Sequence, residues 1–339
     1  MDKIAIVILT YNLENYISES IESVLNQKTT YQYRIFIGDD ASSDRTPDIL
    51  KDYAQKYPDK IEVRYSNTNL GCLGNGNRMF DKLQSEYFTL LDGDDIWLDE
   101  YHLQKQIDFL ETHKDYIICA ANTQYIRNGK PSEYMIDSRY LNETYSFEDF
   151  LNNDVPYFHP SATMFRNVIY KYGLPACYKE AENTFENCAL RGDDFRRIQH
   201  LEKGKLFLMD NLFSYYRIHE NGIWQGATEL KRNIETAIEN NFLRKYYKNT
   251  SYFTYFNNCF AGSYTSLLKK LIFKFDFLNI YKLNIKETEL LTSLFCDIAK
   301  ENIPFGTESK TVVYEKRMDK NNILIRCIRK IVKLLKNIV

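Results

Sequence analysis

The run Asp92-Gly93-Asp94-Asp95 has the clearest chemistry in this sequence. It follows the apolar residues 87–91, so three carboxylates stand together at the end of what is expected to be a buried strand. Like charges in close proximity raise one another's pKa, and a bound cation relieves that cost. Oxygen ligands suit Mg²⁺ or Mn²⁺ better than Zn²⁺. A polar turn without an ion is the alternative, and the neighbouring segments bear on the choice.

Strands and helices are expected to alternate on both sides of this run. Strands are expected over residues 3–9, 34–37, 61–65 and 87–91. Amphipathic segments separate them, as in the helix where Ile17, Ile21 and Val24 share one face. Such a series predicts an α/β fold with a mostly parallel sheet, whose ligands bind outside the carboxyl ends of the strands. Polar clusters stand at four such ends: Thr10-Tyr11-Asn12, Asp39-Asp40, residues 67–69 and residues 92–95.

Two phosphate-binding signatures are missing from the sequence. Neither a Gly-x-Gly-x-x-Gly fingerprint nor a Gly-Lys-Ser/Thr loop occurs in it. If phosphates bind at the predicted site, a metal ion is therefore expected to meet them.

Residues 3–100 resemble the nucleotide-sugar-binding half of a family 2 glycosyltransferase with the GT-A fold, which has a Rossmann-like central sheet flanked by helices. The matching pieces occur in the family's order: Val7-Ile8-Leu9-Thr10-Tyr11-Asn12, Asp39-Asp40-Ala41-Ser42-Ser43-Asp44, Asn69-Leu70-Gly71, Asn77, and Asp92-Gly93-Asp94-Asp95 before Trp97. The resemblance implies that the donor is bound by Thr10, Tyr11, Asn12, Asp40, Asn69, Asn77 and Asp92. It also implies that Thr10, Tyr11 and Asp40 line the nucleoside pocket, that Asp92 lies near the ribose, and that Asp94 holds the metal.

Some of these residues also have plainer interpretations. Asn12 and Asp44 are common turn formers, and Tyr11 is a common packing aromatic. The family often has an arginine immediately before the asparagine at position 77, whereas Gly76 stands here and Arg78 follows. The diphosphate contact of that arginine is therefore not carried over.

Asp193 and Asp194 are the expected source of a catalytic base. An inverting sugar transfer needs a carboxylate, separate from the metal cluster, that takes the proton of the acceptor hydroxyl. The resembled family has a Glu-Asp pair at this place, so Asp194 aligns with the base and Asp193 is the second choice. The alternative is an N-cap for the helix that carries Phe195 and Ile198.

The segment Tyr215-Tyr216-Arg217-Ile218-His219 is similar to a Tyr-Arg-x-His segment that recurs in this family. A neutral imidazole is a competent Mn²⁺ ligand beside carboxylates, so His219 is expected to bind the metal with Asp94. A surface histidine is the alternative. Arg217 is expected near the donor diphosphate. His159, which precedes Pro160, is interpreted as structural.

Composition narrows the class of protein. The chain has 339 residues, 44% hydrophobic and 27% charged, which is ordinary for a globular protein. Seven dispersed cysteines without a Cys-x-x-Cys pair indicate reduced thiols in a cytosol rather than a disulfide framework or a zinc site. The net charge of −2 disfavours a nucleic-acid binder. No signal peptide or membrane-spanning run is expected.

Four parts are expected along the chain: a GT-A domain over residues 1–226, a helical appendage over 227–303, a linker over 304–318 and a basic amphipathic helix over 319–339. Residues 127–145 are expected to form an irregular loop over the site. The aromatic residues of the appendage, especially between Tyr246 and Phe260, are interpreted as core packing, and an acceptor platform is the alternative. Residues 320–339 carry six basic side chains and no acid. Such a helix suits the inner face of the cytoplasmic membrane, the alternative being packing on its own domain or on another subunit.

These observations lead to one hypothesis and two alternatives. The hypothesis is a metal-dependent, inverting glycosyltransferase that uses a UDP-sugar or another nucleotide-diphosphate sugar. Its acceptor would be a bacterial surface glycan, a lipid-linked saccharide or a glycoprotein, and a homo-oligomer is possible. The first alternative is a nucleotidyltransferase of related fold, although no basic triphosphate loop follows the first strand. The second is a non-catalytic partner of an active transferase.

Overall fold

The computed structural model describes residues 2–272 and 285–300, apart from residues 82, 183, 189, 191, 220, 221 and 223–225. It divides into two compact units. The first contains Met1–Asn187 and Arg191–Gly226, and the second contains Cys188–Leu190 and Ala227–Val339. The linker and the basic helix expected over residues 304–339 lie outside the described residues.

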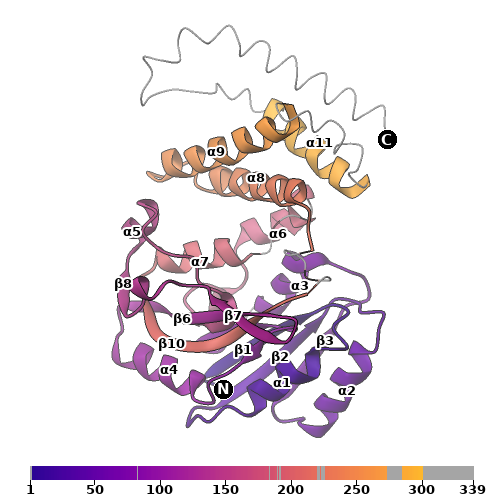
Figure 1. Cartoon of the computed structure of the whole chain (residues 1–339), viewed down its shortest axis with the longest axis vertical. Coiled ribbons are helices and arrows are strands. Elements are labelled where there is room, and N and C mark those ends of the chain that lie inside the picture. The colour runs from indigo at the N-terminus through magenta and orange to yellow at the C-terminus, as the bar shows by residue number, and fades with distance from the viewer. Residues whose placement is uncertain are drawn as a thin grey trace, which may run out of the picture. The chain divides into compact units, whose positions relative to one another are not determined.

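A ten-stranded mixed sheet forms the centre of the first unit in the described part of the chain (Figure 1). The main path runs β3-β2-β1-β4-β9-β6-β10-β5, with β7 beside β6 and β8 beside β10. Pairing is parallel from β3 to β4 and between β6 and β10, while β9 runs antiparallel to both its neighbours. This confirms the predicted α/β class. The strands are β1 (Ile4–Thr10), β2 (Tyr33–Asp39), β3 (Ile61–Tyr65), β4 (Tyr87–Asp92), β5 (Ile96–Trp97), β6 (Tyr116–Arg127), β7 (Lys130–Tyr134), β8 (Glu143–Tyr145), β9 (Thr163–Arg166) and β10 (Lys205–Ile218).

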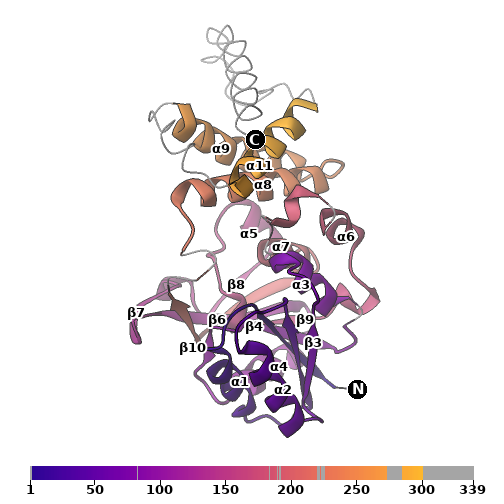
Figure 2. The same ribbon diagram turned by 90° about the vertical axis from the view of Figure 1, so that its right-hand side faces the viewer.

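Helices cover both faces of this sheet (Figures 1 and 2). On one face lie α1 (Ile17–Leu25), α2 (Thr46–Lys56) and α4 (His102–Thr112). On the other lie α3 (Gly71–Phe80), α6 (Ala176–Glu182) and α7 (Asp193–Leu201). The central strands are therefore buried on both sides, which explains why β1 is apolar from Ile4 to Leu9 rather than alternating.

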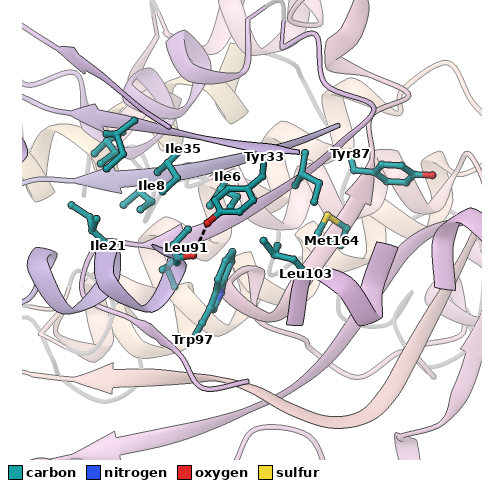
Figure 3. Packing of buried hydrophobic residues seen from close by; sticks show 14 of the residues in the cluster. Ile6, Ile8, Ile21, Tyr33, Ile35, Tyr87, Leu91, Trp97, Leu103 and Met164 are labelled. Carbon is teal, nitrogen blue, oxygen red and sulfur yellow. Dashed lines mark hydrogen bonds between the residues drawn. The ribbon is translucent and has the colours of Figure 1, made fainter. Parts of the chain in front are cut away.

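The core between the sheet and the first set of helices is closely packed (Figure 3). Ile6 and Ile8 of β1 meet Ile21 of α1 and Leu103 of α4 in one buried cluster. Side chains alternate along each strand, so in β4 Tyr87 and Leu91 join this cluster. The intervening Phe88 stacks on Phe165, with ring centroids 5.0 Å apart. This packing fixes the strand ends that carry the polar residues.

One local expectation needs correction. Residues 127–145 are not irregular: they contain β7, a 3₁₀ turn at Ser138–Tyr140 and β8.

Two further features position the site. β10 stays paired with β6 up to Ile218, with register shifts along the way. Ser146 and Asp149 form a capping box for α5 (Phe147–Leu151).

The described part of the second unit is helical. It contains α8 (Glu229–Tyr246), α9 (Phe253–Ile272) and α11 (Ile285–Lys300). Aromatic rings fill its interior: Tyr247 stacks on Phe256 at 4.1 Å, and Tyr264 lies 6.0 Å from Phe295. These four rings are buried and pack a core, whereas Tyr246 is exposed. Within the described residues, no helix has the length and apolar character to cross a bilayer.

Candidate active site

The strand ends that carry polar residues are aligned by the register of the sheet. Thr10 of β1 lies opposite Asp39 of β2, and Leu9 lies opposite Asp92 of β4. Asp40 continues this row, since its amide donates to the carbonyl of Thr10 over 3.0 Å. The predicted clusters after β1, β2 and β4 therefore share one edge of the sheet.

The acidic run forms a tight turn that is fixed by its own backbone. The amide of Asp95 donates to the carbonyl of Asp92 over 2.9 Å, and that of Gly93 donates to Leu9 over 3.0 Å. The Ser20 hydroxyl reaches the carbonyls of Gly93, at 2.8 Å, and of Asp95, at 2.6 Å. A Cβ at position 93 would lie 2.9 Å from the Leu9 carbonyl oxygen. Only glycine fits there without a shift, so Gly93 allows this turn to sit against β1.

Asp95 points into the protein and acts as a hydrogen-bond acceptor. It is fully buried; its Oδ2 accepts from Ser161 Oγ over 2.7 Å and its Oδ1 from the Arg217 amide over 3.0 Å. Burial raises its pKa well above the usual range, and the charges of Asp94 and Asp92 add to that shift. Both carboxylate oxygens are occupied, so the geometry fits a structural role.

Asp94 points toward the end of β10. Its Oδ2 lies 2.9 Å from Nε2 of His219, although 125 positions separate the two residues. Both side chains are partly accessible, Asp94 at 20% and His219 at 10%. This is the pair that the sequence analysis assigned to a metal.

A carboxylate beside an imidazole fits the donor set of Mn²⁺, and Mg²⁺ would use the carboxylate. The other ring nitrogen of His219, Nδ1, is buried and has no hydrogen-bond partner among the described residues. Asp94 and His219 are thus the residues that would hold a divalent ion here.

A second grouping is formed by Asp92, Asp95 and His159, whose ligand atoms lie within 4.8 Å of one another. It is less suited to an ion because Asp95 already uses both oxygens. Moreover, Nδ1 of His159 accepts from the amide of Ser161 over 3.3 Å. Burial lowers the pKa of His159 to about 4, so the ring is neutral. These contacts agree with the structural interpretation of His159.

Asp92, the first residue of the acidic turn, feels the charge of the second acidic pair. Its side chain is 41% exposed. Although the side chain is half-exposed, the surrounding protein removes part of the hydration of its carboxyl group, which raises the pKa of Asp92 well above the usual range; the next cause is the negative charge of Asp193. The structure therefore brings the second pair to the same site.

Asp193 and Asp194 occupy the first turn of α7. The N-cap is Gly192, with φ of 84°, and no side chain caps the helix, so the capping alternative does not hold. Asp193 accepts from the buried Arg196 over 2.8 Å, and Asp194 accepts from Arg197 over 2.6 Å. Negative charge is favourable at a helix N-terminus. The two carboxylates are thus held by different arginines.

Aromatic rings surround the arginine that holds Asp194. The Arg197 guanidinium lies 5.9 Å from the ring of Phe150, 5.4 Å from that of Tyr157 and 5.3 Å from that of Phe158. Tyr157 is half-exposed, and its pKa is raised well above its usual value by the protein atoms that displace water around it and then by the charges of Asp193 and Asp194. Tyr157 therefore lies close to both acids.

The residues after β1 differ in what they offer a ligand. Thr10 is buried, and its Oγ1 has no hydrogen-bond partner among the described residues. Tyr11 is exposed at 46%. Asn12 adopts a φ of 54°, donates its amide to Ser42 Oγ over 2.9 Å and accepts from the Ser43 amide over 2.8 Å. Asn12 is thus a turn former in this geometry, while Thr10 and Tyr11 offer groups to a ligand.

Asp40 holds the start of α3. Its two carboxylate oxygens accept from the amides of Leu70, at 2.8 Å, and of Gly71, at 2.9 Å. Burial raises its pKa, and the neighbouring charge of Arg78 opposes that shift. Arg78 itself donates to the carbonyl of Asp39 over 2.6 Å. Arg78, which stands after Asn77 where the family often has an arginine before it, thus lies beside Asp39 and Asp40.

The two remaining asparagines are not at the acidic turn. The side-chain amide of Asn69 reaches the carbonyl of Asp40 over 3.4 Å, on an exposed loop. Asn77 is buried, and its amide donates to the carbonyl of Tyr178 and to Glu182 Oε1, both in α6. In this structure Asn77 ties α3 to α6.

Arg217 is held by the backbone of the acidic turn and by residues at the start of α1. Its Nε donates to the carbonyl of Asp94 over 2.8 Å, and its Nη2 donates to Glu19 over 2.6 Å. The guanidinium also lies 4.9 Å from the ring of Tyr16. Sequence reasoning missed Tyr16, Glu19, Ser20 and Ser161, because nothing in their local spacing distinguishes them from ordinary helix or turn residues.

Comparison with known proteins agrees with the resemblance. Residues 5–173 match the family model described as Glycosyl transferase family 2. An uncharacterized protein of Mycobacterium tuberculosis is 28% identical over 235 residues, which are 68% of this chain and 64% of that protein. The chain thus spans just under two thirds of that relative. Minor teichoic acid biosynthesis protein GgaB of Bacillus subtilis is 27% identical over 221 residues, 64% of this chain and 23% of that protein.

Among solved structures, residues 1–349 of Staphylococcus aureus TarS in complex with UDP-GlcNAc match with a TM-score of 0.55 at 16% identity. The match covers 86% of this chain and 80% of that chain. It shows a shared fold. With the ordered motifs, the GT-A-like sheet and the family match over residues 5–173, the chain belongs to glycosyl transferase family 2.

Proposed function

We propose that this protein is a metal-dependent, inverting glycosyltransferase that moves a sugar from a nucleotide-diphosphate donor to an acceptor hydroxyl. One relationship carries the proposal. Asp94 lies 2.9 Å from His219 at the carboxyl edge of the sheet, and the second acidic pair is close enough for Asp193 to raise the pKa of Asp92. A metal-binding pair and a separate carboxylate at one edge are what such a transfer requires.

The donor would lie along the strand ends. In this proposal Thr10 and Tyr11 contact the nucleoside, Asp40 and Asn69 shape that pocket, and Asp92 accepts from the ribose. Asp94 and His219 hold Mn²⁺ or Mg²⁺, which when bound neutralises the charge that develops on the leaving diphosphate. Arg217 would add positive charge at that end, in which case its contact with Glu19 must give way to the donor.

The acceptor would enter beside α7. Asp194 takes the proton of the attacking hydroxyl, and its hydrogen bond from Arg197 orients the carboxylate. Asp193 is the second candidate for this role, since its charge already acts on Asp92. Both carboxylates are separate from the metal-binding pair, which leaves them free to act as bases.

The family narrows the substrates further. We propose a UDP-sugar donor, either hexosyl or N-acetylhexosaminyl, and an acceptor in a bacterial surface glycan, a lipid-linked saccharide or a glycoprotein. The TarS structure of the same fold was solved with UDP-GlcNAc, and GgaB is a teichoic acid biosynthesis protein by name. Both facts support this choice of substrate class.

The test is a screen of nucleotide-sugars for donor hydrolysis by the full chain, with EDTA, with Mg²⁺ and with Mn²⁺. We expect one UDP-sugar to be turned over only when a divalent ion is present, and Asp94→Ala to abolish the turnover. Absence of turnover with every donor and ion would contradict an active transferase. Release of pyrophosphate from a nucleoside triphosphate would instead favour the nucleotidyltransferase alternative.

We also propose that residues 319–339 attach the protein to the inner face of the cytoplasmic membrane. The proposal rests on their sequence alone, in which Leu324, Ile328, Ile331 and Leu335 share one helical face opposite basic residues. Flotation with anionic liposomes should be lost in a chain that ends at Lys316. Equal flotation of both chains would remove the idea.

A further inference from the structure

The first turn of α1 contacts the end of β10 next to the acidic turn. Tyr16 is the N-cap residue of α1, and Glu19 lies in its first turn. The ring of Tyr16 lies 4.7 Å from the imidazole of His219 and 4.9 Å from the guanidinium of Arg217. Glu19 accepts from Arg217 over 2.6 Å. Tyr16 and Glu19, at the start of α1, therefore contact Arg217 and His219. Arg217 lies at the end of β10, and His219 follows that strand directly.

The same helix is fixed to the turn that carries Asp94. Ser20 donates to the carbonyls of Gly93 and Asp95, and Ser23 Oγ accepts from the amide of Trp97 over 3.1 Å. One face of α1 thus binds the acidic turn while its first turn binds the Arg217–His219 segment. The separation of Asp94 and His219 depends on this helix.

His219 needs such a contact more than most histidine ligands do. A metal-binding histidine is commonly oriented by a hydrogen bond from its second ring nitrogen to a carboxylate or carbonyl. The Nδ1 atom of His219 has no hydrogen-bond partner among the described residues. The packing of Tyr16 against the ring is then what limits its rotation.

Glu19 acts on the other ligand. With Nη2 on Glu19 and Nε on the Asp94 carbonyl, the Arg217 guanidinium is held against the backbone of Asp94 rather than its carboxylate. Without Glu19 the guanidinium is free to turn toward the Asp94 carboxylate and compete with a cation for it.

We infer that Tyr16 and Glu19 are positioning residues that orient His219 and Asp94 for a divalent cation. This inference rests on the proposed metal-dependent function. It assigns a role to two residues outside the motifs by which the site was first identified.

The test is a titration of the full chain with Mn²⁺ alone, with free Mn²⁺ measured by electron paramagnetic resonance. Residues that orient metal ligands typically contribute ten- to hundredfold to affinity. Tyr16→Leu and Glu19→Ala should therefore each weaken binding by about tenfold or more. Tyr16→Phe, which keeps the ring, should stay within about twofold of the wild type. Glu22→Ala is the matched control, because Glu22 lies on the same helix but accepts from Tyr53.

A double-mutant cycle separates positioning from general loss of structure. In a His219→Ala background, Tyr16→Leu should add less than about twofold, because the ring it orients is gone. An undiminished effect in that background, or a wild-type affinity for Tyr16→Leu, would overturn the role of Tyr16. Wild-type affinity for Glu19→Ala would overturn that of Glu19. Thermal unfolding of each variant identifies those that fail to fold. Tyr16→Phe and Glu22→Ala show how much a substitution in this helix changes Mn²⁺ affinity when the proposed contact is kept.

The outcomes also distinguish this inference from the proposed function. If Asp94→Ala and His219→Ala weaken Mn²⁺ binding but Tyr16→Leu and Glu19→Ala do not, the metal site stands and the positioning role is wrong. If the wild type binds no Mn²⁺, the metal dependence in the proposed function is wrong and this inference falls with it.

Discussion

The Nε2 atom of His219 lies 2.9 Å from the Oδ2 atom of Asp94, and the adjacent Asp95 points the opposite way, into the protein. Two neighbouring acids therefore have different environments. One lies beside an imidazole at the surface of the site, and the other is a buried acceptor for Ser161 and Arg217.

This difference predicts that alanine at position 94 lowers activity, whereas alanine at position 95 lowers stability. Asp94→Ala should lower kcat/KM for donor turnover by about a hundredfold or more, with little change in the thermal midpoint. Asp95→Ala should lower the thermal midpoint, because the Ser161 hydroxyl and the Arg217 amide each lose a buried partner at about 1–3 kcal/mol. Calorimetry with donor-hydrolysis assays measures both. A stable but inactive Asp95→Ala would contradict the structural role of Asp95.

Gly93 predicts a backbone effect. Gly93→Ala would place a Cβ 2.9 Å from the Leu9 carbonyl oxygen and 3.0 Å from Leu13, so it should be destabilising by about 1–3 kcal/mol and should displace the acidic turn. Gly262→Ala is the control, since an added Cβ in α9 meets nothing within 4 Å. That variant should be neutral or more stable by about 0.5–1 kcal/mol. Equal unfolding midpoints for the two variants would contradict the steric argument.

The second acidic pair predicts unequal roles. Asp194→Asn should lower kcat by about 10²–10⁴-fold while the KM for the donor changes little, as expected for loss of a general base. Asp193→Asn should have the smaller effect on kcat. It should also lower the pKa of Asp92, because it removes the charge of Asp193. Steady-state kinetics of both variants test the assignment, and a larger loss in Asp193→Asn would transfer the base role to Asp193.

Buried histidines predict a loss of stability in acid. The pKa of His102 and that of His200 are each lowered to about 3 by burial, against 6.5 when exposed. The unfolded chain therefore takes up protons between pH 6.5 and pH 3 that the folded chain does not. The stability present above pH 6.5 falls through that window by up to about 1.4 kcal/mol per pH unit for each ring.

His102→Gln should flatten this dependence, because it removes one of these two buried rings. Urea unfolding between pH 4 and pH 7 measures the slope. In the folded protein His102 lies 2.7 Å from Gln106 Oε1 and stacks on Phe213 at 4.5 Å, so His102→Gln is expected to cost some stability at every pH. The prediction therefore concerns how steeply the free energy of unfolding changes with pH, and not its value at any one pH. An unchanged slope in His102→Gln would show that another group dominates.

The sequence alone determined the sheet and the place of the site. The apolar runs at β1 and β4 are long enough and uniform enough to require burial on both faces, which predicts parallel strands. Polar residues directly after them then had to meet at one edge, and Thr10, Asp40 and Asp92 do so. The sequence predicted the secondary structure less well where the residues are polar, as in residues 127–145. The strands there are held by backbone hydrogen bonds, which leave no hydrophobic pattern in the side chains.

Only the tertiary structure decided where each acid points. Asp94 and Asp95 have the same chemistry and adjacent positions, and their directions are set by Ser20, Ser161 and Arg217, which lie far away in the chain. The same holds for Tyr16 and Glu19, whose contacts with His219 and Arg217 exist because β10, which is paired with β6, ends beside the start of α1. Local propensity fixes a strand or a helix within a few residues, whereas the partners of a side chain depend on which distant segments the packed core brings together.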